Sequence, residues 1–142
     1  MPTISLDREL AAELIRRYGL RPGDLVVEVG SGEGHFLNAL RALGMRVLGI
    51  EPNMMSMARA WSDGVDTIAA HFGPGTAEYL AAKYGTAKLV IAHSVRAGSE
   101  EFGRLVAGGS RCLTPEGAIA VLATGANAVV EIRPDLAMRR AA

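Results

Sequence analysis

The fold is decided by residues 25–34, which read Leu-Val-Val-Glu-Val-Gly-Ser-Gly-Glu-Gly. An apolar run of strand length leads directly into glycines separated by single residues, and residues 36–43 then carry apolar side chains at helical spacing. Glycine lets the backbone turn tightly and lets a ligand approach without a Cβ in the way. The stretch therefore predicts a buried strand, a ligand-binding turn and the start of a helix.

The same alternation continues along the chain. Further strands are predicted at residues 46–50, 65–70, 88–92 and 118–123, with helices between them. Continuous apolar strands joined by helices are typical of a parallel sheet that is covered on both faces. Right-handed crossovers then predict an α/β fold, a three-layer doubly wound (Rossmann-like) sheet of order 3-2-1-4-5 with a shortened C-terminal part. Residues 127–132 are expected to add an antiparallel edge strand, and residues 1–142 to form a single domain.

Composition and charge exclude several classes of function. Lys+Arg and Asp+Glu both number 15, so the net charge is zero and gives no bulk electrostatic case for nucleic acid or an anionic membrane as partner. Cys112 is the single cysteine, which excludes an internal disulfide and a cysteine zinc cluster. The 3 histidines lack ligand spacing, so no metal is predicted. The start, MPTISLDREL, lacks a signal-peptide pattern and no apolar run has membrane-span length, so a cytoplasmic location is expected.

The spacing of the glycines narrows the class of ligand that this loop is expected to bind. A dinucleotide fingerprint needs glycine at position 35, which holds His35, and the Gly-Lys-Ser/Thr of a phosphate-binding loop is absent. Glu28 ends an apolar strand, where burying an unpaired carboxylate costs several kcal/mol, so it is predicted to meet a cation or hydrogen-bond donors of a ligand. A carboxylate that accepts from its own loop amides is the alternative.

Glu51 follows the second strand, where a doubly wound sheet presents an acid to ribose hydroxyls. Its carboxylate can accept two hydrogen bonds from a vicinal diol, and a solvated acid before Pro52 is the alternative. Together with the glycine turn and Glu28, this acid predicts a nucleoside that carries an amino-acid-like group.

These residues resemble a known family. The pattern Glu28-x-Gly30-x-Gly32-x-Gly34, with Glu51 at the next strand end and LTPEG at 113–117, resembles the class I S-adenosylmethionine-dependent methyltransferases. The stretches RVLGIEPN and HFGPGTAEYLAAKYGTAKLVIAHSV are similar to the central domain of sugar C-methyltransferases. The resemblance covers roughly residues 20–123 and implies S-adenosylmethionine as the cofactor.

The resemblance also implies where the cofactor lies. The glycine loop would hold its methionine part, Glu51 its ribose, and residues 52–54 and 70–72 would border its adenine. Core packing is the alternative for Met54 and Phe72. The predicted cofactor-binding set is Glu28, Gly30, Ser31, Gly32, Gly34, Glu51, Pro52, Met54, His71, Phe72 and His93.

The chain departs from the sugar enzymes in ways that affect catalysis. Gly98 stands where their active-site loop carries a histidine, and Ala70 and His71 occupy the turn where many class I enzymes place an acid. The family also has a cysteine-rich zinc-binding region before this domain and a further domain after it, which these residues do not match. The resemblance therefore supports the prediction of cofactor binding better than it supports the prediction of catalytic residues.

His93 is the candidate general base. It ends the fourth predicted strand, where open α/β sheets place ligands, and histidine ordinarily titrates near neutral pH. A packing role is the alternative. The function predicted is S-adenosylmethionine-dependent methyl transfer to a small molecule. A same-fold enzyme with other S-adenosylmethionine chemistry, such as cyclisation of its aminobutyryl arm, and a non-catalytic cofactor-binding partner subunit stay open.

The last expectation concerns assembly. A full class I sheet has seven strands, whereas the chain after residue 123 has room for one more. A bare apolar edge invites pairing with another chain. A homodimer is therefore expected, with residues 127–138 near the interface; a monomer whose tail covers the edge is the alternative.

Overall fold

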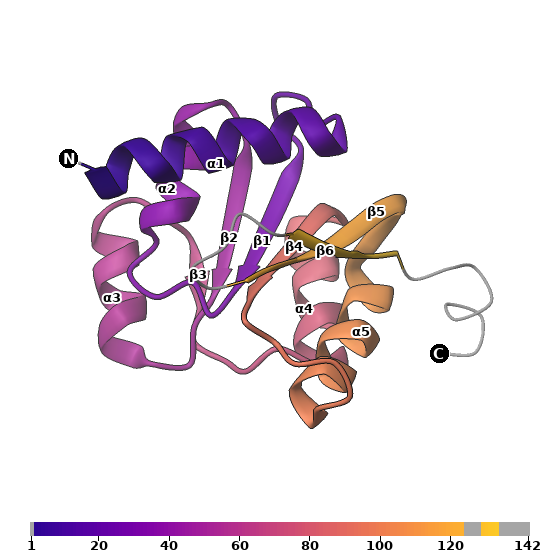
Figure 1. Ribbon diagram of the computed structural model, residues 1–142. Coiled ribbons are helices and arrows are strands. Elements are labelled where there is room, and N and C mark those ends of the chain that lie inside the picture. The colour runs from indigo at the N-terminus through magenta and orange to yellow at the C-terminus, as the bar shows by residue number, and fades with distance from the viewer. Residues whose placement is uncertain (1, 124–128, 134–142) are drawn as a thin grey trace. The chain divides into compact units, whose positions relative to one another are not determined.

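The computed structural model describes residues 2–123 and 129–133 (Figure 1). Helices and strands alternate along the chain up to the last strand. In chain order they are α1 (Pro2–Tyr18), β1 (Leu25–Val29), α2 (His35–Ala42), β2 (Arg46–Ile50), α3 (Met54–Ser62), β3 (Thr67–Ile68), α4 (Pro74–Tyr84), β4 (Ala87–His93), α5 (Glu100–Cys112), β5 (Leu113–Leu122) and β6 (Val129–Ile132).

The strand order is β3-β2-β1-β4-β5-β6, which confirms the predicted α/β class and the order 3-2-1-4-5. The chain divides into two compact units, Met1–Ala70 and His71–Ala142. A single domain over 1–142 stays a prediction.

In the first unit, β1 and β2 are parallel and in level register, from Leu25↔Arg46 to Val29↔Ile50. β3 continues this order, since it is parallel to β2 and pairs Gly49 with Thr67. β3 has only 2 residues, fewer than the predicted 65–70. Because β1 and β2 end level with each other, the loop at 30–34 and the residues after Ile50 leave the same edge of the sheet.

The core of the first unit consists mainly of aliphatic side chains. Leu14 of α1, Leu37 and Leu40 of α2 and Leu48 of β2 are fully buried. The spacing of Phe36, Leu37 and Leu40 places them on one side of α2, as the sequence predicts. Burial of this side fixes the helix that follows the glycine loop.

In the second unit, β4 and β5 are parallel, and their register is interrupted. Ala87 pairs with Leu113, but Leu89 already pairs with Ala118. Residues 115–117, whose Pro-Glu-Gly composition is typical of a turn, therefore lie within β5, where the register shifts. The prediction of the strand start was wrong because Leu113 finds a partner in Ala87, and the extra residues of β5 are accommodated locally.

β6 pairs with β5 in antiparallel register, from Ile119↔Ile132 to Leu122↔Val129. This confirms the predicted antiparallel edge strand. Of the segment 127–138 expected near a dimer interface, residues 127–128 and 134–138 lie outside the described residues.

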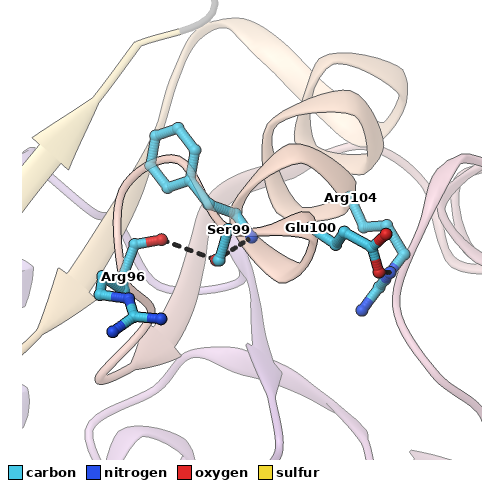
Figure 2. A network of polar contacts seen from close by, with 5 residues as sticks. Arg96, Ser99, Glu100 and Arg104 are labelled. Carbon is cyan, nitrogen blue, oxygen red and sulfur yellow. Dashed lines mark hydrogen bonds and ion pairs between the residues drawn. The ribbon is translucent and has the colours of Figure 1, made fainter.

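Ser99 is the N-cap of α5 and precedes an acidic first turn. Its Oγ accepts from the Phe102 backbone N–H at 3.0 Å and donates to the Arg96 carbonyl at 2.7 Å. Figure 2 shows this hydroxyl between the two backbone groups, with Glu100 and Arg104 forming an ion pair on the first turns of the helix. The cap thus joins the β4–α5 loop to α5.

Replacing Ser99 with alanine is expected to lower the free energy of unfolding by about 1 kcal/mol, because it removes the cap and leaves the Phe102 N–H without its acceptor. Urea unfolding followed by circular dichroism measures the change. Ser99→Asp, which restores an acceptor, is the matched control and is expected to recover most of the loss. Equal stability of the alanine and aspartate variants would contradict the capping role.

Cys112, at the end of α5, is fully buried. Burial disfavours the thiolate and raises the pKa of the thiol from its ordinary 9.0 to about 12. The unfolded chain therefore loses this proton near pH 9 while the folded chain keeps it, so the folded state binds more protons between these values. Its contribution to stability is complete below about pH 9 and is lost as the pH rises.

We expect the free energy of unfolding to fall above pH 9, by at most about 1.4 kcal/mol per pH unit from this group. Urea unfolding at pH 8, 9 and 10 measures the slope. Cys112→Ala lacks the titrating thiol and shares every other group, so its slope is expected to be shallower. Parallel slopes for the two proteins would rule out the thiol as the source.

Within the described ranges, no helix is both long and apolar enough to cross a bilayer. The same residues contain no cluster of three or more His, Cys, Asp or Glu side chains that could hold a metal ion.

Candidate functional site

The loop between β1 and α2 is held mainly by backbone hydrogen bonds, to the end of β2 and within the loop. The N–H groups of Gly30 and Ser31 both donate to the Ile50 carbonyl at the end of β2, at 2.8 and 3.4 Å. The Gly34 N–H donates to the Ser31 carbonyl at 3.0 Å, which closes a tight turn. These amides are occupied within the protein. Donors for an anionic ligand group are therefore expected in the first turn of α2, whose N–H groups have no intrahelical acceptor.

The backbone conformation at positions 30 and 32 favours glycine, which has no side chain. Their φ angles are +74° and +59°, in the left-handed region that other residues adopt at a cost. A Cβ built on either residue meets nothing within 4 Å, so the space above the loop is open. Gly34 differs, because its Cβ would lie 3.2 Å from Val65. The first two glycines thus leave room for a ligand, and the third allows close packing.

Glu51 lies beside this loop, directly after β2. Its Oε1 accepts from the Gly32 N–H at 2.7 Å, and its Oε2 accepts from the Asn53 N–H at 2.9 Å. An ionised carboxylate has about four acceptor positions, so about two stay available for a vicinal diol. The structure therefore brings together the predicted loop and the predicted acid, and also shows a contact between them that the sequence did not indicate.

A row of buried polar side chains lies at the base of the loop and includes one of its own residues. Glu28, Ser31 and Thr67 are the buried polar residues of the described chain, and Glu28 is only 3% exposed. Glu28 pairs with Gly49 in the β1–β2 register, and Gly49 pairs with Thr67 in the β2–β3 register. Glu28, Gly49 and Thr67 therefore share one face of the sheet.

Gly49 makes room for this row. A Cβ at Gly49 would lie 2.3 Å from the Ser31 Oγ and 3.1 Å from the Thr67 Oγ1. The Ser31 side chain thus occupies the position that a side chain at residue 49 would need. Thr67 Oγ1 donates to the Val65 carbonyl at 3.0 Å, whereas the Ser31 Oγ has no hydrogen-bond partner in the described part of the chain. Gly49 was not among the predicted site residues, although a glycine inside an apolar strand was an available signal.

The remaining candidates of the first unit are on its surface. Pro52 and Met54 follow Glu51, and Met54 at the start of α3 is 69% exposed. The core alternative for Met54 is therefore wrong. Its predicted place beside the adenine stays a prediction.

The second unit contributes three predicted residues, and they differ in burial. Phe72 is buried, and a Cβ on Gly108 of α5 would lie 2.5 Å from its ring, so packing accounts for this side chain. His71 is exposed, and its carbonyl accepts from the Thr76 hydroxyl at 2.7 Å. His93 is exposed at the end of β4. Adenine contacts by Phe72 and His71 and a base role for His93 stay predictions.

A family model for a methyltransferase domain matches residues 27–121, which include the loop, Glu51 and β4. The chain belongs to the methyltransferase-domain family. It is also 36% identical over 110 residues to the C-methyltransferase NovU of Streptomyces niveus, a match that spans 78% of this chain and 26% of that protein. The chain therefore corresponds to about a quarter of this curated relative.

Solved methyltransferase structures share the fold. A putative methyltransferase from an antibiotic biosynthesis pathway of Anabaena variabilis matches with a TM-score of 0.62 and 20% identity, over 81% of this chain and 44% of that one. The plantazolicin methyltransferase BpumL, solved in complex with SAH, matches with a TM-score of 0.59 and 16% identity, over 82% and 46%. These comparisons confirm the predicted class I fold.

The site residues fit the cofactor of the methyltransferase family. The open space over Gly30 and Gly32, the acceptor positions left on Glu51 and the buried Ser31 hydroxyl all lie at one sheet edge of the first unit. This donor and acceptor set suits a nucleoside with a charged amino-acid arm.

The loop after β4 contains residues with positive φ angles. Ser94 has a φ of +52°, a conformation that a serine adopts at some energetic cost, and its N–H donates to the Leu122 carbonyl at 2.9 Å. Gly98, in place of the expected histidine, also has positive φ. The conformation of Ser94 was not predicted, because no local sequence pattern indicates a serine with a positive φ angle.

Proposed function

We propose that this chain binds S-adenosylmethionine and transfers its methyl group to a small molecule. The observation that carries the proposal is the position of Glu51: its carboxylate contacts the glycine loop and keeps acceptor positions for a diol, next to open space. When bound, this cofactor supplies a methyl sulfonium, an electrophile for an SN2 displacement. The similarity to a C-methyltransferase supports a small-molecule acceptor.

In this proposal the residues align the reactants. Glu51 would hold the ribose hydroxyls, and the N–H groups in the first turn of α2 would hold the carboxylate of the amino-acid arm. His93 accepts the proton that leaves the acceptor as the new bond to the methyl group forms. Alignment of the acceptor with the methyl group would lower the barrier by fixing the reacting atoms in place before reaction.

Incubation with methyl-labelled S-adenosylmethionine and a panel of small-molecule acceptors tests the function. The expected result is a labelled, methylated acceptor together with S-adenosylhomocysteine in the mass spectrum. A rearranged cofactor fragment would instead favour cyclisation of the aminobutyryl arm. Cofactor binding with no turnover across the panel, and turnover only after a second subunit is added, would favour a non-catalytic partner role.

We also propose that the chain forms a homodimer through the edge strand β6. Val130 of β6 is 57% exposed, and an exposed apolar side chain on an edge strand favours pairing with a second copy. Light scattering at micromolar concentration is expected to give about twice the 14.9 kDa chain mass. A mass near that of one chain would refute the dimer.

We also propose a cytoplasmic location, where the reducing environment would keep the Cys112 thiol reduced.

A further inference from the structure

Glu51 joins two loops that are far apart in the sequence. Its Oε1 reaches back 19 residues to the Gly32 N–H, and its Oε2 accepts from the Asn53 N–H. Asn53 is the N-cap of α3, and its Oδ1 accepts from the Ser56 N–H at 3.0 Å. A chain of hydrogen bonds thus runs from the middle of the glycine loop through one carboxylate to the first turn of α3.

Among the amides of the glycine loop, the Gly32 N–H is the one that donates to a side chain, that of Glu51. Gly30 and Ser31 are tied to the Ile50 carbonyl, and Gly34 to Ser31, all by backbone groups. Gly32 lies between these ties with φ of +59°, and its N–H is held by a side chain. The bond is short and charge-assisted, the stronger kind of hydrogen bond.

We propose that Glu51 is a positioning residue for the glycine loop as well as a ligand of the ribose, and that it fixes the loop before any cofactor binds. The role toward the ribose rests on the proposed function, whereas the role toward the loop rests on the contacts of the protein alone. Preformation saves the cost of ordering the loop when a ligand binds. Glu51 therefore contributes to affinity even for groups of the ligand that it does not touch.

Replacing Glu51 with glutamine should affect its role toward the loop and its role toward the ribose differently. Two backbone N–H donors converge on the Glu51 side chain, and a carboxylate accepts from both. A carboxamide accepts from one and turns a second donor toward the other, which leaves one amide unsatisfied. Ribose hydroxyls donate and accept, so they tolerate a carboxamide. Glu51→Gln should therefore harm the loop more than the contact with the ribose.

Amide hydrogen exchange in the ligand-free protein, followed by NMR, tests the loop role directly. In the wild type the Gly32 amide is expected to be protected, and in Glu51→Gln it is expected to exchange at least about tenfold faster. Glu13→Gln is the matched control, because it removes an acid paired with Arg16 on α1 and should leave Gly32 unchanged. A Gly32 amide that exchanges equally fast in the wild type and in Glu51→Gln would overturn the proposal.

Binding of two probes separates the roles. S-Adenosylhomocysteine and its 2′,3′-dideoxy analogue are titrated by calorimetry into the wild type and Glu51→Gln. The loop role predicts that the glutamine variant loses at least about fivefold in affinity for both probes. A loss confined to the probe with hydroxyls would mean that Glu51 acts on the ribose alone.

Two further outcomes keep the proposal decidable. If Glu51→Gln does not fold, Glu51→Ala removes both acceptors and is expected to raise the exchange rate at Gly32 at least about tenfold; wild-type exchange in that variant would overturn the loop role. If neither probe binds the wild type, the proposed function fails, and exchange at Gly32 still decides the loop role.

Discussion

Glu51→Ala is expected to weaken the binding of S-adenosylmethionine by at least about hundredfold. The substitution removes the acceptors for the ribose hydroxyls, and charge-assisted hydrogen bonds contribute roughly 1.5–3 kcal/mol each. It also removes the acceptors of the Gly32 and Asn53 amides, so the glycine loop loses its attachment to the residues after β2. Both losses act in the same direction.

Isothermal titration calorimetry with S-adenosylmethionine measures this effect. Glu13→Ala is the control, since it removes an equal charge from an exposed pair in the same unit. It is expected to bind like the wild type. An unchanged dissociation constant for Glu51→Ala would place Glu51 outside the cofactor site and would remove the main support for the proposed function.

Gly49→Ala is expected to lower the free energy of unfolding by about 2 kcal/mol, in the range for overpacking a buried site. The new Cβ would lie 2.3 Å from the Oγ and 2.9 Å from the Cβ of Ser31. Ser31 must then move, and it carries the glycine loop with it. Cofactor affinity is expected to fall together with stability.

A second substitution tests this explanation. Ser31→Gly combined with Gly49→Ala removes both Ser31 atoms that the new methyl group meets, so the double variant is expected to regain most of the lost stability in urea unfolding. Gly103→Ala is the control for a glycine without such a contact, because a Cβ there meets nothing within 4 Å. It lies in α5 and is expected to raise stability by up to about 1 kcal/mol. A stable Gly49→Ala single variant would show that Ser31 adapts freely.

The sheet and its order were predictable because local patterns suffice for them. The apolar runs at 25–29, 46–50 and 88–92 have strand length, and helices with one apolar side separate them. Handedness of the crossovers then leaves few arrangements. The start of β5 was not predictable in this way, because Pro-Glu-Gly at 115–117 has the composition of a turn, and only the pairing of Leu113 with Ala87 places it inside a strand.

The family, the order of the strands and the two elements of the candidate site could all be inferred from the amino-acid chain alone. Those two elements are the glycines at 30, 32 and 34 and the acid at 51. Spacing along the chain encodes these features, and spacing is visible without a structure. Two contacts became visible only in the folded molecule: Glu51 accepts from the Gly32 N–H, 19 residues earlier, and Ser31 occupies the place beside Gly49. Such contacts depend on the level register of β1 and β2, which brings distant backbone groups within hydrogen-bond distance, and no local pattern in either segment records that register.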